Sequence, residues 1–339
     1  MKKKKAKISV IEKLKRFSKK PSGKFVVSLF TTWFVCGIIS LFLLYGPWGG
    51  FRTFMITSTE TTINHKYISR IFFPESVINK VMESNTVIEL DKITDTDSIK
   101  MSDEKNKVVL TDISKNGYDA WMLEISDPST VMLGVSKYFK VKGQKIPYLL
   151  ENYPHAIAGI NAGGFGDANG FGNGGIPMGL VISEGDMMYL PNKSNYNIIG
   201  FNTDNVLVLG KYKKSELESL NLRDAVEFTP FLIINGEAAE IKGNGGWGLA
   251  PRTAIGQRQD GTVVFIVVDG RSVNSSGVTM KTLQEIMIEQ NCYNAANLDG
   301  GSSTVLSYKD EIINNPSGSD ADGMRFLPNA FIVVDKDLK

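Results

Sequence analysis

The sequence predicts an α+β protein, in which a mixed, strand-rich sheet domain with few helices follows one transmembrane helix. From Val108 onward, short apolar runs are separated by Gly, Asn, Asp and Pro, which is the pattern of strands and turns. Few stretches of this region have helical periodicity, and the clearest runs from Thr279 to Gln290. Phe25 to Tyr45 is a run of 21 residues without a charge, long enough as a helix to cross about 30 Å of hydrocarbon.

Charge is divided unevenly along the 339 residues. Residues 1–24 hold eleven Lys or Arg and one acidic residue, Glu12. Removing them from chain totals of 38 basic and 36 acidic residues leaves 27 against 35, a formal charge of −8 on the remainder. A nucleic-acid-binding face needs a basic surface, so we expect no nucleic acid partner for the main body.

The basic segment predicts the topology. Lys and Arg before an apolar helix favour a cytoplasmic N-terminus, so we expect a single-pass protein of the cell membrane with an extracellular C-terminal domain. Its contact with the lipid bilayer would be made by residues 25–45. A cleaved signal peptide is the alternative, but the long basic segment and the lack of a small-residue cleavage site at Leu44 to Trp48 favour a retained anchor.

Four regions follow from these patterns. They are a basic cytoplasmic tail at 1–24, the transmembrane helix at 25–45, a membrane-proximal amphipathic segment and linker at 46–107, and the folded domain at 108–337. Two short stretches, Ile63 to Phe72 and Val77 to Met82, have apolar residues at helical spacing and fit either the bilayer surface or the main domain. Residues 86–107 are polar and mixed in charge, which is typical of a solvated connector.

The sequence predicts neither a disulfide nor a metal centre. Cys36 lies within the apolar run, and Cys292 is alone in the rest of the chain, where we expect it to be buried. The two histidines have no cysteine cluster beside them. Asp167 and Asn169 are weak candidates for calcium ligands in a fragment too incomplete for an EF-hand, so we expect no cofactor.

Two aspartates follow predicted buried strands. Thr262–Asp269 contains six apolar residues in succession, and Ala295–Leu298 is a second run after the predicted helix. Strand, helix and strand predict a crossover between parallel neighbours. Asp269 and Asp299 would then lie at one edge of the sheet, where such sheets bind ligands, with α-carbons about 5 Å apart on adjacent strands or about 10 Å apart on alternate strands.

A hairpin is predicted immediately before the first of these aspartates. Asp260-Gly261 is a strong signal for a two-residue turn, and counting back from it places Arg252 directly opposite Asp269, with Arg271 two residues further on. A three-residue loop with a bulge would shift this register by one residue and direct the arginine elsewhere. An ordinary Arg–Asp ion pair is the alternative to a ligand site.

The turn Asn297–Thr304 combines one carboxylate, two glycines and three hydroxyls. Bare backbone amides at Gly300 and Gly301, beside the hydroxyls of Ser302 and Ser303, suit an anionic ligand. With two arginines close by, this predicts a phosphate site next to two candidate acid–base groups. A tight turn without a ligand is the alternative interpretation.

Two glycine-rich stretches are further candidate walls of the site. The stretch from Gly159 to Gly175 is followed by no helix, which argues against a dinucleotide or P-loop site. It forms either a ligand wall or a flexible connection. Trp247 stands among glycines, where its ring either stacks on a sugar or anchors the loop to its own domain.

Five motifs of the chain, taken in order, resemble those of the phosphodiester glycosidase family. They are Asn161-Ala162-Gly163-Gly164-Phe165, Pro251-Arg252-Thr253-Ala254-Ile255-Gly256, Val268-Asp269-Gly270-Arg271, Asn297-Leu298-Asp299-Gly300-Gly301-Ser302-Ser303 and Arg325-Phe326-Leu327-Pro328-Asn329. The resemblance covers about residues 108–337, and residues 52–88 resemble bacterial members linked to exopolysaccharide biosynthesis. The chain departs from the family pattern by Ala162 after Asn161 and by one glycine fewer after Asp299.

The resemblance implies hydrolysis of a sugar-1-phosphodiester at its anomeric carbon. A phosphodiester leaving group is already a weak base, so charge stabilisation matters more than acid assistance. We therefore assign Arg252 to the phosphate and the carboxylates of Asp269 and Asp299 to the anomeric centre, one of them as base or nucleophile. The expected substrate- and phosphate-binding residues are Asn161, Arg271, Gly300, Gly301, Ser302, Ser303, Arg325, Asn329 and Trp247.

Two alternatives stay open. Ser302 or Ser303 as a covalent nucleophile would need a base, and His155 is the only histidine of the domain, so hydroxyls that bind phosphate fit better. The chain as a whole is expected to be a membrane-anchored extracellular hydrolase of cell-envelope or exopolysaccharide glycans. A non-catalytic membrane-anchored receptor for anionic envelope glycan is the alternative.

Overall fold

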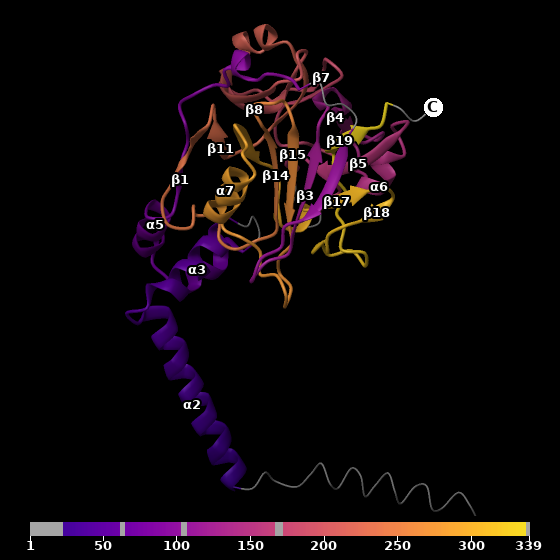
Figure 1. Cartoon of the computed structure of the whole chain (residues 1–339). Coiled ribbons are helices and arrows are strands. Elements are labelled where there is room, and N and C mark those ends of the chain that lie inside the picture. Colours follow the sequence, from indigo (N-terminus) through magenta and orange to yellow (C-terminus); the bar gives the residue numbers. More distant parts are fainter. Residues whose placement is uncertain (1–22, 62–64, 103–106, 167–171, 337–339) are drawn as a thin grey trace, which may run out of the picture. The chain divides into compact units, whose positions relative to one another are not determined.

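The computed structural model in Figure 1 describes residues 23–61, 65–102, 107–166 and 172–336, so most of the predicted basic tail lies outside the described residues. The chain divides into two compact units between Thr53 and Phe54. The first unit contains helix α2 (Gly23–Tyr45), which has no buried residue and is long and apolar enough to cross a membrane. A signal sequence near an N-terminus has the same properties, so the helix is confirmed and its insertion in a bilayer stays a prediction.

The second unit is built on β-sheets, and every pair of neighbouring strands described in it is antiparallel. A seven-stranded sheet has the order β12 (Glu237–Ala238), β11 (Phe231–Ile234), β16 (Asn294–Asn297), β14 (Arg252–Gln257), β15 (Val263–Val268), β3 (Ala120–Ile125) and β2 (Val108–Asp112). One five-stranded sheet has the order β18 (Glu311–Ile312), β17 (Leu306–Tyr308), β5 (Ala156–Asn161), β19 (Asn329–Val334) and β4 (Val131–Val135). The other has the order β7 (Asp186–Tyr189), β6 (Val181–Ser183), β10 (Leu222–Glu227), β8 (Asn195–Asn202) and β9 (Leu207–Lys213). A two-stranded sheet joins β1 (Val87–Ile88) to β13 (Glu240–Ile241).

Helices are few beside these strands, which confirms the predicted α+β class, whereas the antiparallel pairing of all described strands corrects the prediction of a mixed sheet. The described α-helices after α2 are α3 (Gly49–Glu60), α4 (Lys66–Phe72), α5 (Glu75–Glu83), α6 (Ile146–Leu150) and α7 (Met280–Glu289). The described 3₁₀ helices are η1 (Thr96–Ser98), η2 (Pro128–Thr130), η4 (Lys214–Glu216), η5 (Glu218–Leu220) and η6 (Gly301–Ser303). Helices α4 and α5 coincide with the two predicted amphipathic stretches.

The central core lies between the inward faces of the three large sheets. Phe201 of β8, Phe265 of β15 and Phe331 of β19 are buried in it, and the rings of Phe201 and Phe331 meet edge to face with centroids 6.2 Å apart. Full burial of each ring contributes about 1.5–3 kcal/mol relative to an exposed ring. These side chains therefore hold the three sheets together.

Strand β15 is buried on both faces, as its apolar run predicted. Alternate side chains face the central core and a second cluster, in which Ile266 packs with Leu283 of helix α7. Helix α7 lies over this face of the sheet (Figure 1) and begins after Thr279, whose hydroxyl accepts a hydrogen bond from the Thr282 amide at 3.1 Å. Cys292 belongs to the same cluster and is buried, which confirms the prediction.

The two strands joined through α7 run in the same direction but are not neighbours. Strand β14 lies between β15 and β16 and is antiparallel to both. The expectation of parallel neighbours was wrong. Strand β14 forms a hairpin with β15, and β16 pairs with the other edge of β14. The ends of β15 and β16 are therefore separated by two strand spacings, about 10 Å.

The register of the β14–β15 hairpin also differs from the prediction by one residue. Arg252 lies opposite Val268 and not opposite Asp269. The cause is the loop, in which Gly261 adopts a φ of +89° and three residues, Gln259 to Gly261, close the hairpin. Because side chains alternate along a strand, this shift places Arg252 on the face that α7 covers and Asp269 on the opposite face.

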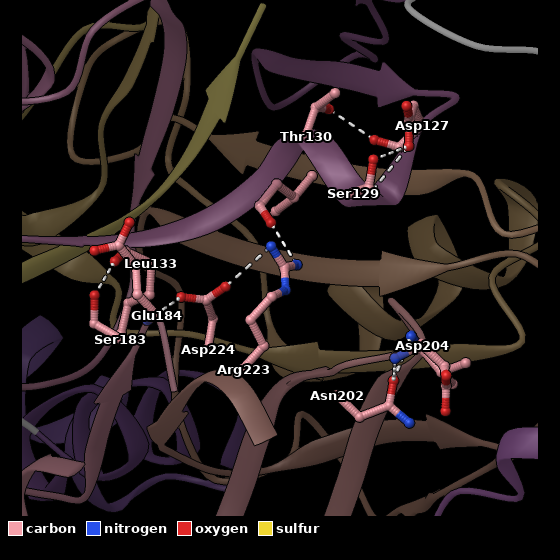
Figure 2. Close-up of polar contacts among 12 residues, drawn as sticks. Asp127, Ser129, Thr130, Leu133, Ser183, Glu184, Asn202, Asp204, Arg223 and Asp224 are labelled. Atoms are coloured by element: carbon pink, nitrogen blue, oxygen red, sulfur yellow. Dashed lines mark hydrogen bonds and ion pairs between the residues drawn. The ribbon is translucent and has the colours of Figure 1, made fainter. Parts of the chain in front are cut away.

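A buried ion pair connects two sheets away from this hairpin. Figure 2 shows the Asp224 carboxylate of β10 beside the Arg223 guanidinium, with Oδ2 3.3 Å from Nη1. The other carboxylate oxygen accepts from the Glu184 amide at 3.1 Å, and Arg223 Nη2 donates to the Val131 carbonyl at the start of β4 at 2.7 Å. Burial raises the pKa of Asp224, and the arginine acts in the opposite direction. The contacts give this pair a structural function.

Residues 86–102 are hydrogen-bonded along the domain, which corrects the expectation of a solvated connector. Strand β1 pairs with β13, the Thr94 amide donates to the Leu209 carbonyl at 2.9 Å, and the Lys100 amide donates to the Gln259 carbonyl at 2.7 Å. These contacts are made by backbone groups, so the polar side chains of the segment did not predict them.

Candidate active site

The turn that follows β16 has few backbone amides left for a ligand. The Gly301 amide donates to the Pro251 carbonyl at 2.8 Å, the Ser303 amide to the Gly300 carbonyl at 3.2 Å, and the Gly300 amide to the Asp299 carboxylate at 3.1 Å. The expectation of bare amides was therefore wrong for Gly300 and Gly301. The Ser303 amide closes the 3₁₀ turn η6, the Gly301 amide ties the turn to Pro251, and the Gly300 amide is taken by the Asp299 side chain. Contact with an anion at this turn therefore falls mainly to side chains.

Two arginines border the glycines of this turn. A Cβ atom at Gly301 would lie 3.1 Å from Arg271 Nη2, and one at Gly300 would lie 3.7 Å from Arg252 Cα and 2.9 Å from the Pro251 carbonyl oxygen. Gly301 also has a φ of +62°, a conformation that glycine adopts at low cost. The structure thus brings Arg252, Arg271 and both glycines together, as the sequence predicted.

The Arg252 guanidinium is buried and held by carbonyl oxygens. Nη2 donates to the carbonyls of Trp247 at 2.7 Å and Gly248 at 2.9 Å, and Nε donates to that of Val278 at 3.3 Å. Nη1 donates to none of the described residues. Burial lowers the pKa of Arg252 to about 10, with a smaller contribution from the charge of Arg271. The arginine still carries its charge at neutral pH.

Arg271 is a second cation at this turn, close enough for its charge to act on Arg252. Its backbone is in the left-handed region with a φ of +59°, which costs a non-glycine residue about 1–3 kcal/mol. The residue as a whole is exposed to solvent. The protein atoms around its guanidinium exclude part of the water, and this desolvation lowers the pKa of Arg271. Within the described parts of the chain, neither Arg271 nor Arg252 forms an ion pair with a carboxylate.

Arg325 reaches the same turn from the segment before β19. Its Nη1 donates to the Ser302 hydroxyl at 3.2 Å and its Nη2 to the Gly172 carbonyl at 3.3 Å, while its Cζ lies 5.2 Å from the centre of the Phe165 ring. The two described ends of the long glycine-rich stretch therefore lie against Arg325. The candidate calcium ligands, Asp167 and Asn169, lie outside the described residues.

Asp269 is buried and both of its carboxylate oxygens accept hydrogen bonds. Oδ1 accepts from Asn314 Nδ2 at 2.9 Å, and Oδ2 accepts from the Asn315 amide at 2.8 Å. Burial raises the pKa of Asp269, whereas the two hydrogen bonds lower it, and the nearby charge of Asp119 raises it. Asn314 and Asn315 were not predicted, because an Asn-Asn pair after a short strand has the signal of an ordinary turn.

Asp299 is half-buried at the start of the turn. Its backbone amide donates to the Ala162 carbonyl at 3.0 Å, and its carbonyl accepts from Asn161 Nδ2 at 2.5 Å. Both contacts tie this residue to the strand β5 of the second sheet. The Asp299 carboxylate is therefore the more accessible of the two predicted catalytic acids, since Asp269 is enclosed.

Asn161 and Asn329 are fully buried at the ends of neighbouring strands. Asn161 Oδ1 accepts from the Thr253 hydroxyl at 2.7 Å and from the Val305 amide at 3.1 Å. Asn329 Oδ1 accepts from the Gly163 amide at 2.8 Å, while its Nδ2 has no partner in the described residues. Asn161 thus connects β14 to the turn, and the role of either residue toward substrate stays a prediction.

The Trp247 ring is half-buried against the cluster on the α7 face and lies 5.9 Å from Arg252 Cζ. These contacts support the interpretation of a loop anchor, and stacking on a sugar stays a prediction. His155 immediately precedes β5, whose far end reaches the turn at Asn161. Six residues of extended chain span about 20 Å, so a Ser–His pair with Ser302 is not formed.

Comparison with known proteins places these residues in a family context. A family model described as phosphodiester glycosidase matches residues 154–334. The SPbeta prophage-derived uncharacterized protein YomE of Bacillus subtilis is 29% identical over 191 residues, which are 54% of this chain and 29% of that protein. The N-acetylglucosamine-1-phosphodiester alpha-N-acetylglucosaminidase of Bos taurus is 30% identical over 86 residues, 25% of this chain and 16% of that protein. The chain thus spans less than a third of the length of these relatives.

A solved structure has the same fold. The zebrafish N-acetylglucosamine-1-phosphodiester alpha-N-acetylglucosaminidase catalytic domain, auto-inhibited by its pro-peptide, superposes with a TM-score of 0.56 at 17% identity. The match covers 70% of this chain and 86% of that one. A putative exported protein from Burkholderia pseudomallei matches with a TM-score of 0.48 at 14% identity, over 64% of this chain and 74% of that one.

Proposed function

Because the chain belongs to the phosphodiester glycosidase family, we propose that it hydrolyses the bond between the anomeric carbon and the phosphate of a glycosyl phosphodiester. The observation that carries this proposal is the arginine pair at the η6 turn. Arg252 and Arg271 border the adjacent glycines Gly300 and Gly301, and the charge of Arg271 acts on Arg252. Neither arginine has a carboxylate partner in the described residues, and the half-buried Asp299 immediately precedes these glycines. An anionic phosphodiester supplies the charge that this pair lacks.

The phosphate group would lie between the arginines and the Ser302 hydroxyl. Arg252 Nη1 is the guanidinium nitrogen that remains for it, because Nη2 and Nε are held by backbone carbonyls. Arg325 already donates to the Ser302 hydroxyl, which places a third cation at the same turn. As the bond to the anomeric carbon breaks, its electron pair passes to the phosphate oxygen, and the arginines stabilise that charge.

Asp299 would act at the anomeric carbon. As a general base it takes a proton from the water that attacks this carbon, and as a nucleophile it forms the glycosyl ester that water then cleaves. The configuration of the released sugar distinguishes the two courses. Asp269 is enclosed by Asn314 and Asn315, so we assign its carboxylate to holding the Asn314 turn against the end of β15.

Helix α2 would anchor the chain in a membrane, with residues 1–24 in the cytoplasm and the sheet domain outside the cell. Substrates available there are glycans of the cell envelope or exopolysaccharide that carry sugar-1-phosphodiester linkages. Trypsin added to intact cells that make the full chain should cleave the sheet domain. Protection of this domain in intact cells, with cleavage after lysis, would contradict the topology.

The hydrolase proposal is tested with the full chain in detergent and an N-acetylglucosamine-1-phosphodiester. Release of free N-acetylglucosamine is expected, and Asp299→Asn should lower kcat/KM by about 10²–10⁴-fold. The matched control is Asp186→Asn, which changes an exposed aspartate on β7 and should leave turnover unchanged. Binding of the phosphodiester without turnover by wild-type protein would instead support the glycan receptor.

A further inference from the structure

Helix α3 contacts the loop that holds Arg252. Asn244 Nδ2 of this loop donates to the Thr57 hydroxyl of α3 at 3.0 Å, and Thr57 is fully buried. Gly248 packs directly on the helix, since a Cβ atom there would lie 2.5 Å from Ser58 Oγ and 2.8 Å from Ser58 Cα. Any side chain at this position would push the loop and the helix apart.

The same loop, residues 243–248, is held on its other side by Asn85. The Asn85 Oδ1 atom accepts from the Asn244 amide at 3.0 Å. A Cβ atom at Gly246 would lie 2.4 Å from the Asn85 carbonyl oxygen. Gly246 and Gly248 have φ values of +80° and +58°, which permit this close path between the two contacts.

The held loop ends in the two carbonyls that fix Arg252. Trp247 and Gly248 accept from Nη2, and the Trp247 ring lies against the guanidinium. A displacement of the loop therefore displaces the guanidinium and its remaining nitrogen, Nη1. Misplacement of a substrate-positioning group by about 1 Å lowers the rate of an enzyme by up to about 100-fold.

We propose that Thr57 and Ser58 of α3 are positioning residues that hold Arg252 in place to bind phosphate. This inference rests on the assignment of Arg252 to phosphate in the proposed function. The helix lies well before residues 154–334, which match the family model, so the site of this chain includes a part that the family match does not cover. The segment next to the apolar helix then contributes to activity as well as to attachment.

The test measures binding of inorganic phosphate to the full chain in detergent by calorimetry, so it does not depend on turnover. Thr57→Val removes the hydroxyl with little change in shape and should weaken phosphate binding about tenfold, because the loop loses a hydrogen bond in a buried site. Thr57→Ser keeps the hydroxyl and should restore binding to within about twofold. The matched control is Thr59→Val, since Thr59 is buried on the same helix but donates to the helix carbonyl of Met55.

Repeating Thr57→Val in the Arg252→Lys background distinguishes positioning of Arg252 by Thr57 from a merely structural role of Thr57. We expect a change of less than about twofold there, because the arginine that Thr57 positions is already absent. An equal loss in both backgrounds, or wild-type affinity in Thr57→Val, would overturn the inference. So would a wild-type chain that binds no phosphate. If Thr57→Val does not fold, Thr57→Ala tests the same contact. Absence of glycosidase turnover with normal phosphate binding would reject the proposed hydrolysis and leave this inference standing.

Discussion

Replacement of Asn161 by alanine separates a structural role from a ligand role at the centre of the site. The Asn161 side chain makes three hydrogen bonds, to the Thr253 hydroxyl, the Val305 amide and the Asp299 carbonyl. At about 1 kcal/mol each, their loss lowers the free energy of unfolding by about 3 kcal/mol. Partners left unsatisfied in the buried site raise this cost, so we expect about 3–5 kcal/mol.

The expected loss is measured as a shift of the thermal unfolding midpoint of the full chain. A domain of more than 200 residues shifts by about 2 °C or somewhat more per kcal/mol, so Asn161→Ala should lower Tm by about 6–12 °C. The control is Asn173→Ala, because Asn173 is exposed and its hydrogen bonds to the Val141 carbonyl and from the Gly175 amide compete with water. Its Tm should change by less than about 3 °C.

The opposite pattern would refute the structural reasoning. An Asn161→Ala variant that keeps its Tm within about 2 °C of wild type but does not bind phosphate or release sugar would make Asn161 a substrate ligand. The Thr253→Val variant gives an independent check, because it removes one partner and leaves the asparagine in place. It should lower the free energy of unfolding by about 1 kcal/mol.

Three further predictions concern buried ionisable groups. Burial raises the pKa of Asp269 above its ordinary value of 3.8, so the folded chain binds more protons between the two values and wild-type stability falls as pH rises through this window. Urea unfolding at several pH values should show this slope in wild type and less of it in Asp269→Asn. Burial raises the pKa of Cys292 to about 12, so a thiol reagent at pH 8 should label it only after unfolding, and rapid labelling of folded protein would contradict the burial. Asp224→Asn breaks a buried ion pair and should cost about 3–5 kcal/mol in urea unfolding, whereas Asp204→Asn at an exposed turn should cost less than about 1 kcal/mol.

The elements that the sequence predicted correctly are those whose signals are local. Helix α7 carries its own N-cap at Thr279 and an apolar face, and β15 carries an uninterrupted apolar run. The register of the hairpin was not predicted, because the sequence Asp260-Gly261 permits a loop of two or three residues. The φ of Gly261 decides between them. Its left-handed φ adds one residue to the loop and moves Arg252 to the other face from Asp269.

The sequence predicted which residues of the candidate site lie close together but not the contacts that they make. Arg252, Arg271 and the two glycines of the turn come together as expected. The acceptors of Arg252 could not be predicted, because they are backbone carbonyls, two of them in the Trp247 loop and one at Val278. The direction of the two loop carbonyls depends on the conformation of several glycines. The position of Asp269 likewise depends on Asn314, which reaches it from a turn 45 residues later in the chain.

The arginine pair also links ligand binding to stability. Burial of a cation without a charged partner costs several kcal/mol, and carbonyl oxygens such as those around Arg252 offset only part of this cost. Arg271 adds a second charge beside it and a backbone conformation that is itself unfavourable. An anion bound between the two guanidinium groups relieves their repulsion in the folded state, and the unfolded chain has no such site. Phosphate should therefore raise the unfolding temperature, by an amount that grows with the logarithm of its concentration relative to Kd. This increase should be lost in Arg252→Lys, because the lysine ammonium cannot occupy the same carbonyls and still present a second nitrogen.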